Sequence, residues 1–145
     1  MGRILAIDYG QRRVGLALSD PLKMIAQGLP TLIINSPQDI INWVCAQKEE
    51  REIDRIVLGL PRSLSGEMGP MAREVVDFSG RLAEETKLPV ELVDERLTSR
   101  QAHATFAQGG KKLKGRKEAI DRIAAVLLLE QYLETLNPPP DEPDM

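Results

Sequence analysis

Short, uninterrupted apolar runs constrain the fold of this 145-residue chain more than any other feature. The run Ile4-Leu5-Ala6-Ile7 is followed at once by Asp8, and a similar run, Ile56-Val57-Leu58, comes later in the chain. A strand with one wet face alternates apolar and polar residues, so a continuous apolar run predicts a strand buried on both faces. Such strands need helices above and below them, which predicts an α/β fold with a central sheet.

The segments around these runs supply the remaining elements. Gly10 lies in a turn after Asp8, where we expect it to adopt a positive φ, and residues 14–19 are predicted to pair with residues 3–8 as a hairpin. Further strands are expected at residues 29–34, 55–60 and 90–94, and helices from Ser36-Pro37 to about residue 52, from Pro70 through residue 82, at 98–108 and at 118–136. The order β-β-β-α-β-α-β-α-α predicts a mixed five-stranded sheet flanked by helices.

The charge of the chain is unevenly distributed. The net charge is -3, from 19 Lys+Arg and 22 Asp+Glu, but residues 134–145 hold four acids and no basic residue. Residues 1–133 therefore carry 19 basic and 18 acidic side chains, and the acidic balance does not exclude a nucleic-acid partner. We expect one domain at residues 1–136 and a disordered proline-rich acidic tail at 137–145.

The chemistry open to this chain is narrowed by its single cysteine, Cys45, and its single histidine. They exclude an intrachain disulfide framework, and a His/Cys metal site is nearly impossible, so any metal is expected to be a hard cation held by carboxylates. No apolar run reaches the roughly 18 residues that a membrane span needs. The first residues meet Asp8 too soon for a secretory signal. We therefore expect a cytoplasmic protein without a membrane partner, and we place Cys45 in the core.

Three acidic residues lie where buried elements begin or end. Asp8 closes the first strand, Glu95 closes the last strand beside Asp94, and Asp121 lies in the first turn of an apolar helix. Each also has an ordinary explanation: an acid that starts a turn, a solvated strand end, and an acid favoured by the helix dipole. Neighbouring strand residues face opposite ways, and the pattern does not choose between Asp94 and Glu95. Asp20 ends the antiparallel second strand, roughly 20 Å from Asp8, and is excluded.

Three carboxylates that converge at one end of a sheet suit Mg²⁺, which prefers a few carboxylates, waters and a phosphate substrate. Two such ions about 3.5–4 Å apart would hold the attacking and leaving oxygens of a phosphodiester.

Basic residues near these acids fit a nucleic-acid backbone. We select Arg12 and Arg13 on the hairpin beside Asp8, and the basic residues of a loop predicted at 111–117, which are Lys111, Lys112, Lys114, Arg116 and Lys117. The alternative explanation for the loop is a solvated, mobile segment. Aromatic residues make up only 3% of the chain, which favours recognition of backbone or shape over base stacking.

Four motifs resemble the YqgF/RuvX family, whose members are described as pre-16S ribosomal RNA nucleases similar in fold to Holliday junction resolvases of the RNase H-like superfamily. They keep the family's order over about residues 3–133. The matching segments are Ile7-Asp8-Tyr9-Gly10 with Arg13-Val14-Gly15-Leu16-Ala17-Leu18-Ser19-Asp20-Pro21, then Val57-Leu58-Gly59-Leu60-Pro61 with Ser65-Gly66-Glu67-Met68-Gly69, then Val93-Asp94-Glu95-Arg96-Leu97-Thr98, and finally Ile120-Asp121-Arg122-Ile123-Ala124-Ala125.

The resemblance implies an RNase H-like nuclease domain in which Asp8, Glu95 and Asp121 occupy the three acidic active-site positions. These residues would bind Mg²⁺ or Mn²⁺ and hydrolyse a phosphodiester without a protein nucleophile. The implied substrate is structured RNA, at the 5′ end of pre-16S ribosomal RNA, and a monomer is slightly favoured.

Three alternatives are weighed beside this function. A Holliday junction resolvase would share the carboxylates and needs a dimer for symmetric cleavage. A non-catalytic ribosome-assembly factor would keep the fold, but retention of all three acids counts against it. An actin-like ATPase also opens with an Asp-x-Gly hairpin, but it needs a second domain for which this chain has no room.

Overall fold

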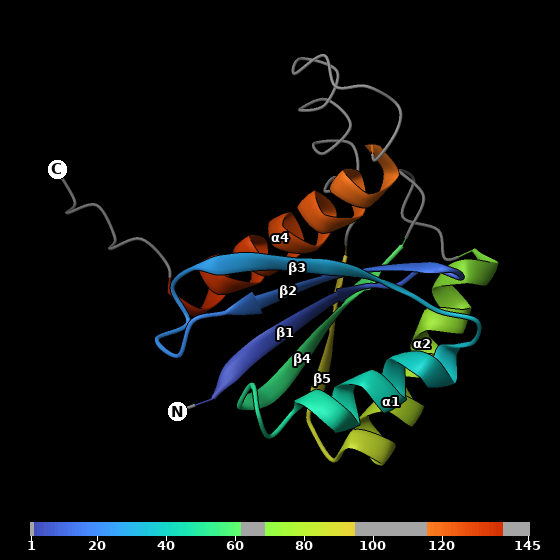
Figure 1. Ribbon diagram of the computed structural model, residues 1–145, viewed down its shortest axis with the longest axis horizontal. Helices are drawn as coiled ribbons and strands as arrows, with labels where there is room; N and C mark the ends of the chain where they lie inside the picture. The colour runs from blue at the N-terminus through green and yellow to red at the C-terminus, as the bar shows by residue number, and fades with distance from the viewer. Residues whose placement is uncertain (1, 62–68, 95–115, 138–145) are drawn as a thin grey trace, which may run out of the picture.

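The computed structural model describes residues 2–61, 69–94 and 116–137, without the side chains of residues 116–121. The helix predicted at 98–108 and the tail from residue 138 lie outside these ranges. The elements are β1 (Arg3–Asp8), β2 (Arg13–Ser19), β3 (Ala26–Ile33), α1 (Pro37–Gln47), β4 (Ile53–Leu60), α2 (Pro70–Thr86), β5 (Val90–Asp94) and α4 (Arg116–Leu136), as Figure 1 shows.

The five strands form one sheet in the order β3-β2-β1-β4-β5. Strands β1, β2 and β3 pair antiparallel, whereas β1, β4 and β5 run parallel, which confirms the predicted mixed sheet. Strand β1 lies at the centre, and all four residues of its apolar run are fully buried. An apolar side chain on either face of this strand therefore finds a helix layer above it.

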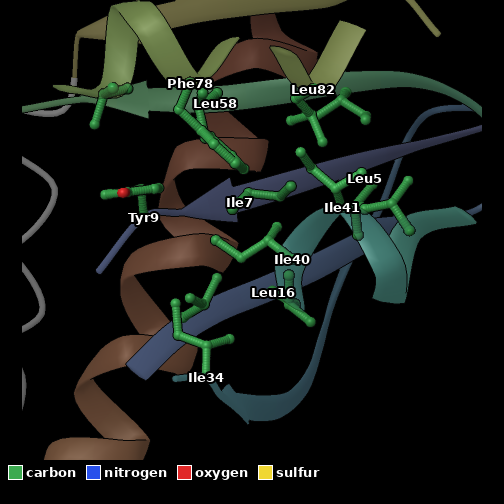
Figure 2. Close-up of a cluster of buried hydrophobic side chains, with 14 of the residues drawn as sticks. Leu5, Ile7, Tyr9, Leu16, Ile34, Ile40, Ile41, Leu58, Phe78 and Leu82 are labelled. Carbon is green, nitrogen blue, oxygen red and sulfur yellow. The ribbon is translucent and has the colours of Figure 1, made fainter. Parts of the chain in front are cut away.

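Alternate residues of β1 belong to two separate cores. Leu5 and Ile7 pack with helices α1 and α2 in the larger core, part of which Figure 2 shows. Ile4 and Ala6 face the other way and pack against helix α4. We call the two sides of the sheet the α1/α2 face and the α4 face. The period-2 alternation of strand side chains makes every residue of β1 belong to one face or the other.

Helix α1 begins where the sequence predicts and ends earlier. The Asp39 side chain accepts the backbone N–H of Ser36 at 3.3 Å, which satisfies a donor at the helix start. The helix ends at Gln47 instead of about residue 52, because the chain must reverse to enter β4. Glu52 takes a left-handed conformation with φ 57°, and the carbonyl of Lys48 accepts the N–H of Ile53 at 2.8 Å.

Two further predictions are wrong. Cys45 is exposed, because the buried stripe of α1 consists of Ile40, Ile41 and Val44 and leaves Cys45 at its edge. Arg116 and Lys117 were predicted in a basic loop, but both lie in the first turn of α4. The remainder of that predicted loop, residues 111–115, lies outside the described residues.

Helix α4 covers the α4 face by packing across β1, β2 and β3. Helix α4 comes close to β3 at Gly28, where an added Cβ would lie 2.6 Å from Cγ and 2.9 Å from Cδ of Arg122, and 3.2 Å from Cγ2 of Val126. A glycine at this position lets the helix lie directly on the strand. Within the described ranges no helix is both long and apolar enough to span a membrane.

We expect Gly28→Ala to lower the free energy of unfolding by about 1–3 kcal/mol, because the new methyl group overlaps the stem of Arg122. Urea denaturation measures this change. The matched control is Gly80→Ala in helix α2, where nothing lies within 4 Å of the added Cβ and the replacement should stabilise the helix by up to about 1 kcal/mol. Adding Arg122→Ala to Gly28→Ala should recover part of the decrease. Equal stability of Gly28→Ala and wild type would contradict this packing.

Candidate active site

Asp8 is the first polar residue after the buried run of β1, and it ends that strand. It pairs with Gly15 of β2 and is half-buried. Because Ile4 and Ala6 lie on the α4 face, the alternation of the strand puts Asp8 on that face too. The central strand therefore delivers one carboxylate to its carboxyl end, beside helix α4.

The turn that follows Asp8 requires glycine for a reason other than the one predicted. An added Cβ at Gly10 would lie 2.1 Å from the carbonyl oxygen of Arg13, so any side chain would clash with the backbone across the turn. Gly10 does not take the positive φ that we expected. The close turn leaves Arg12 and Arg13 exposed at the same edge of the sheet as Asp8, as the sequence predicts.

The carboxyl ends of three parallel strands meet at this edge. Ile7 of β1 is level with Leu58 of β4, and Gly59 of β4 is level with Val93 of β5. Strand β5 ends at Asp94, which pairs with Leu60. Figure 1 shows β1, β4 and β5 running in the same direction, away from the chain's N-terminus. In such sheets, ligands bind beyond the carboxyl ends of the strands.

The register of β5 separates Asp94 from Asp8. Val93 packs in the core on the α4 face, and Asp94 pairs with Leu60, which belongs to the core on the α1/α2 face. Asp94 and Asp8 therefore lie on opposite faces of the sheet. Glu95, the next residue along the chain, lies outside the described residues.

Helix α4 is fixed at its C-terminal half by a polar network. The hydroxyl of Tyr132 accepts a hydrogen bond from Nη1 of Arg55 at 2.8 Å and donates one to the carboxylate of Glu91. Burial, and then the bond to Glu91, raises the pKa of Tyr132. Because Arg55 is level with Ile4, this network ties the helix to the amino ends of β1, β4 and β5.

The N-terminal half of α4 extends toward the carboxyl edge of the sheet (Figure 1). Asp121 lies in α4 eleven residues before Tyr132, which is about 16 Å along a helix. Asp8 lies four residues beyond Ile4, which is about 13 Å along a strand. The turn of α4 that contains Asp121 therefore lies at about the level of Asp8, although the side chain of Asp121 is not described.

The sequence-predicted site is described in part. Asp8, Arg12 and Arg13 lie at one edge of the sheet, while Glu95, Lys111, Lys112 and Lys114 lie outside the described residues, and Arg116, Lys117 and Asp121 are described by their backbone alone. Among the described side chains, no three His, Cys, Asp or Glu residues are grouped to hold a metal ion.

Comparison with known sequences gives a consistent result. The sequence model of a family described as "RuvX: Holliday junction resolvase" matches residues 2–135. A protein of Koribacter versatilis is 42% identical over 142 residues, covering 98% of this chain and 93% of that protein. One of Natranaerobius thermophilus is 38% identical over 132 residues, covering 91% and 94%. Both carry the provisional name of pre-16S rRNA nuclease.

Solved structures share the fold at low sequence identity. RuvC of Thermus thermophilus, in complex with a Holliday junction substrate, superposes with a TM-score of 0.56 at 16% identity and covers 95% of this chain and 97% of that one. The Fowlpox virus resolvase in complex with Holliday junction DNA gives a TM-score of 0.55 at 15% identity, covering 92% and 98%. The sheet and its helices are therefore those of RuvC-like resolvases of the RNase H fold, as predicted.

Tyr9 lies at the same edge of the sheet, and the sequence predicts no role for it. It is 7% exposed, its hydroxyl donates a hydrogen bond to the carboxylate of Glu74 in α2, and its ring packs at 5.2 Å against Phe78. Tyr9 thus anchors the chain immediately after Asp8 to helix α2. The available signal was the alternation of Leu5, Ile7 and Tyr9, which puts all three on the α1/α2 face.

We expect Tyr9→Phe to lower the free energy of unfolding at pH 7 by about 0.5–1.5 kcal/mol, because it removes the bond to Glu74 and keeps the ring. Burial and the Glu74 bond raise the pKa of Tyr9 above its ordinary value of 10.0. The unfolded chain then ionises this group first, so its contribution is complete below pH 10 and is lost as the pH rises above it.

Urea denaturation between pH 7 and 11 should therefore show a steeper alkaline loss of stability in the wild type than in Tyr9→Phe. Tyr132 is present in both proteins and cancels in the comparison. Parallel pH profiles would contradict the role of Tyr9.

Proposed function

This chain belongs to the RuvX family, and from that membership we propose that it is a nuclease that hydrolyses phosphodiester bonds of structured RNA at the 5′ end of pre-16S ribosomal RNA. The observation that carries the proposal is the position of Asp8. It ends the central strand on the α4 face, at the edge where the parallel strands β4 and β5 also end. Such a substrate would place the activity in the cytoplasm.

We propose Asp8, Glu95 and Asp121 as the catalytic carboxylates. Asp94 lies on the opposite face from Asp8, so Glu95 is the acid of that pair left for the site. The level of Asp121 along α4 supports its inclusion, because that helix covers the face to which Asp8 belongs.

An all-carboxylate donor set fits Mg²⁺ or Mn²⁺, since hard cations prefer oxygen ligands. Asp8, Glu95 and Asp121 would hold two such ions, which when bound would supply a water of lowered pKa and neutralise charge on the phosphate oxygens. The contribution of the protein itself is to fix the positions of the carboxylates. The buried run of β1 sets the position of Asp8, and Tyr9 holds the following turn against α2.

The proposed nucleic-acid surface is formed by basic residues. Arg12 and Arg13 lie on the hairpin next to Asp8. The other proposed contacts, by sequence alone, are Lys111, Lys112, Lys114, Arg116 and Lys117. Contacts of this kind bind phosphates without reading sequence and weaken as salt rises.

A Holliday junction is the second candidate substrate, because the matching family is described by that activity. Symmetric cleavage of a junction requires two active sites related by a two-fold axis, so this candidate also requires a dimer. A ribosome-assembly factor without catalysis is the third outcome that an experiment has to separate.

We expect Asp8→Asn and Glu95→Gln to slow cleavage by about 100-fold or more, because each removes a negative charge that would hold the metal ions, while RNA binding and thermal stability stay near wild type. The matched control is Asp94→Asn, which should keep cleavage within about threefold since Asp94 lies on the other face. Cleavage is measured with added Mg²⁺ or Mn²⁺ on pre-16S 5′-leader RNA and on a four-way DNA junction.

Equal cleavage by wild type and Asp8→Asn would remove the nuclease assignment and leave the assembly factor. Cleavage of the DNA junction alone would select the resolvase. Loss of activity in Asp94→Asn with retention in Glu95→Gln would show that the choice between the two acids is reversed.

We expect replacement of Lys111, Lys112 and Lys114 by alanine to weaken RNA binding at low salt. The slope of log affinity against log salt should fall by about 0.7–0.9 for each phosphate that the variant no longer neutralises. Filter binding over a range of KCl concentrations measures the slope. Lys87→Gln, at the end of α2 and far along the chain from these lysines, should leave it unchanged. An unchanged slope in the triple variant would exclude these lysines from the interface.

A further inference from the structure

The connection between β2 and β3 is a tightly bonded turn at residues 20–25, which we call the Asp20 turn. One carboxylate oxygen of Asp20, Oδ1, accepts the backbone N–H groups of Met24 and Ile25, both at 2.8 Å. The backbone of Asp20 also bonds to both sides of the turn, donating to the carbonyl of Ile25 at 3.2 Å and accepting from Lys23 at 3.0 Å. The N–H groups of Ile25 and Met24 bonded to the carboxylate lower the pKa of Asp20 below its ordinary value.

The base of the turn is tied to the central strand. The hydroxyl of Ser19, which is 1% exposed, accepts the N–H of Ile4 at 2.8 Å and donates to the carbonyl of Asp20 at 3.0 Å. At the other side of the turn, Nδ2 of Asn137, the residue that follows α4, donates a hydrogen bond to the carbonyl of Lys23 at 2.8 Å. The Asp20 turn is therefore held in one conformation by β1, by its own acid and by the end of α4.

This well-held turn exposes apolar side chains. Leu22, Met24 and Ile25 are 68%, 60% and 67% exposed. A single exposed apolar residue on a protein surface needs no explanation, but three within four residues of an ordered turn form the kind of patch that marks an interaction site. Because the hydrogen bonds already fix the backbone, binding a partner through these side chains would cost little further conformational entropy.

The patch continues into a shallow groove beside α4. Met24 lines this groove together with Leu133, and the polar residues that complete it are Glu130, Glu134 and Asn137. Both glutamates are exposed. Lys23, the basic residue of the turn, is paired with Asp54 at 3.3 Å. The groove thus has an apolar floor and an acidic rim.

Both charged residues of the rim, Glu130 and Glu134, are acidic. In the sequence, Glu134 is followed by three further acids and no basic residue up to residue 145. This excess of negative charge argues against two possible occupants of the groove. A nucleic acid would be repelled, and a second copy of the chain docking through the same patch would bring like charges together.

We propose that the Asp20 turn and the groove beside it, lined by Met24 and Leu133, form a docking surface for a basic segment of another protein that inserts apolar side chains between the acids. The surface lies at the opposite edge of the sheet from Asp8, because β2 runs antiparallel to β1. A bound partner therefore leaves the carboxyl edge of the sheet open. The proposal does not depend on the proposed function.

The test uses full-length protein and fluorescence anisotropy with three labelled synthetic peptides of equal length. The first is an amphipathic peptide of lysine and leucine. The second has glutamate in place of each lysine of the first, and the third is a peptide made only of lysine. The wild type should bind the lysine/leucine peptide most tightly. The double variant Leu22→Ser, Met24→Ser should bind it at least about tenfold more weakly, and so should Glu130→Gln, Glu134→Gln.

The matched control is Ile33→Ser, which removes an apolar side chain that is 65% exposed at the other end of β3 and should leave the affinity unchanged. Thermal unfolding checks that each variant is folded. Asp20→Asn, which weakens the bonds that hold the turn, provides a second perturbation that leaves every apolar side chain in place and should also weaken binding.

The proposal is overturned if the Leu22→Ser, Met24→Ser variant binds like the wild type, or if lysine alone binds as tightly as lysine with leucine. Light scattering supplies the remaining outcome. A wild type that dimerises while the double variant stays monomeric would make a second copy the occupant and would also overturn the proposal.

Discussion

The rest of the structure depends on the burial of strand β1 on both faces. Its four apolar residues are inaccessible to water because β2 and β4 flank it within the sheet and helix layers cover it above and below. A strand in this position has no freedom to slide, since a shift by one residue would exchange the side chains of the two cores. The first polar side chain after the run, Asp8, is therefore delivered to a fixed place at the sheet edge.

Much of the fold follows from local sequence. The bounds of β1 and β5 match the prediction residue for residue, because apolar runs bounded by polar or turn residues define them. The end of α1 could not be predicted from local sequence. The helix stops where the chain must reverse into β4, which is a tertiary constraint. Exposure of Cys45 was missed for a similar reason. Helical spacing alone does not say how wide the buried stripe of α1 is.

For the candidate site, the sequence predicts residue types but says little about their geometry. Residue pattern alone did not choose between Asp94 and Glu95, because the face on which Asp94 lies is set by its pairing with Leu60 of β4, far away in the chain. Tyr9 was overlooked because its partner, Glu74, lies on a helix 65 residues away in the sequence. Local pattern proposed the carboxylates, and long-range register assigned Asp8 and Asp94 to opposite faces of the sheet.

Helix α4 is the last described element of the chain, yet it covers the face of the first strand. During synthesis, Ile4, Ala6 and Ala17 leave the ribosome long before Ala125, Leu128 and Leu129, which bury them. Until then that face of the sheet is open to water, and a growing or truncated chain is exposed to aggregation and proteolysis. The same order of events means that the α4 face, on which Asp8 lies, is completed only after helix α4 has been synthesised.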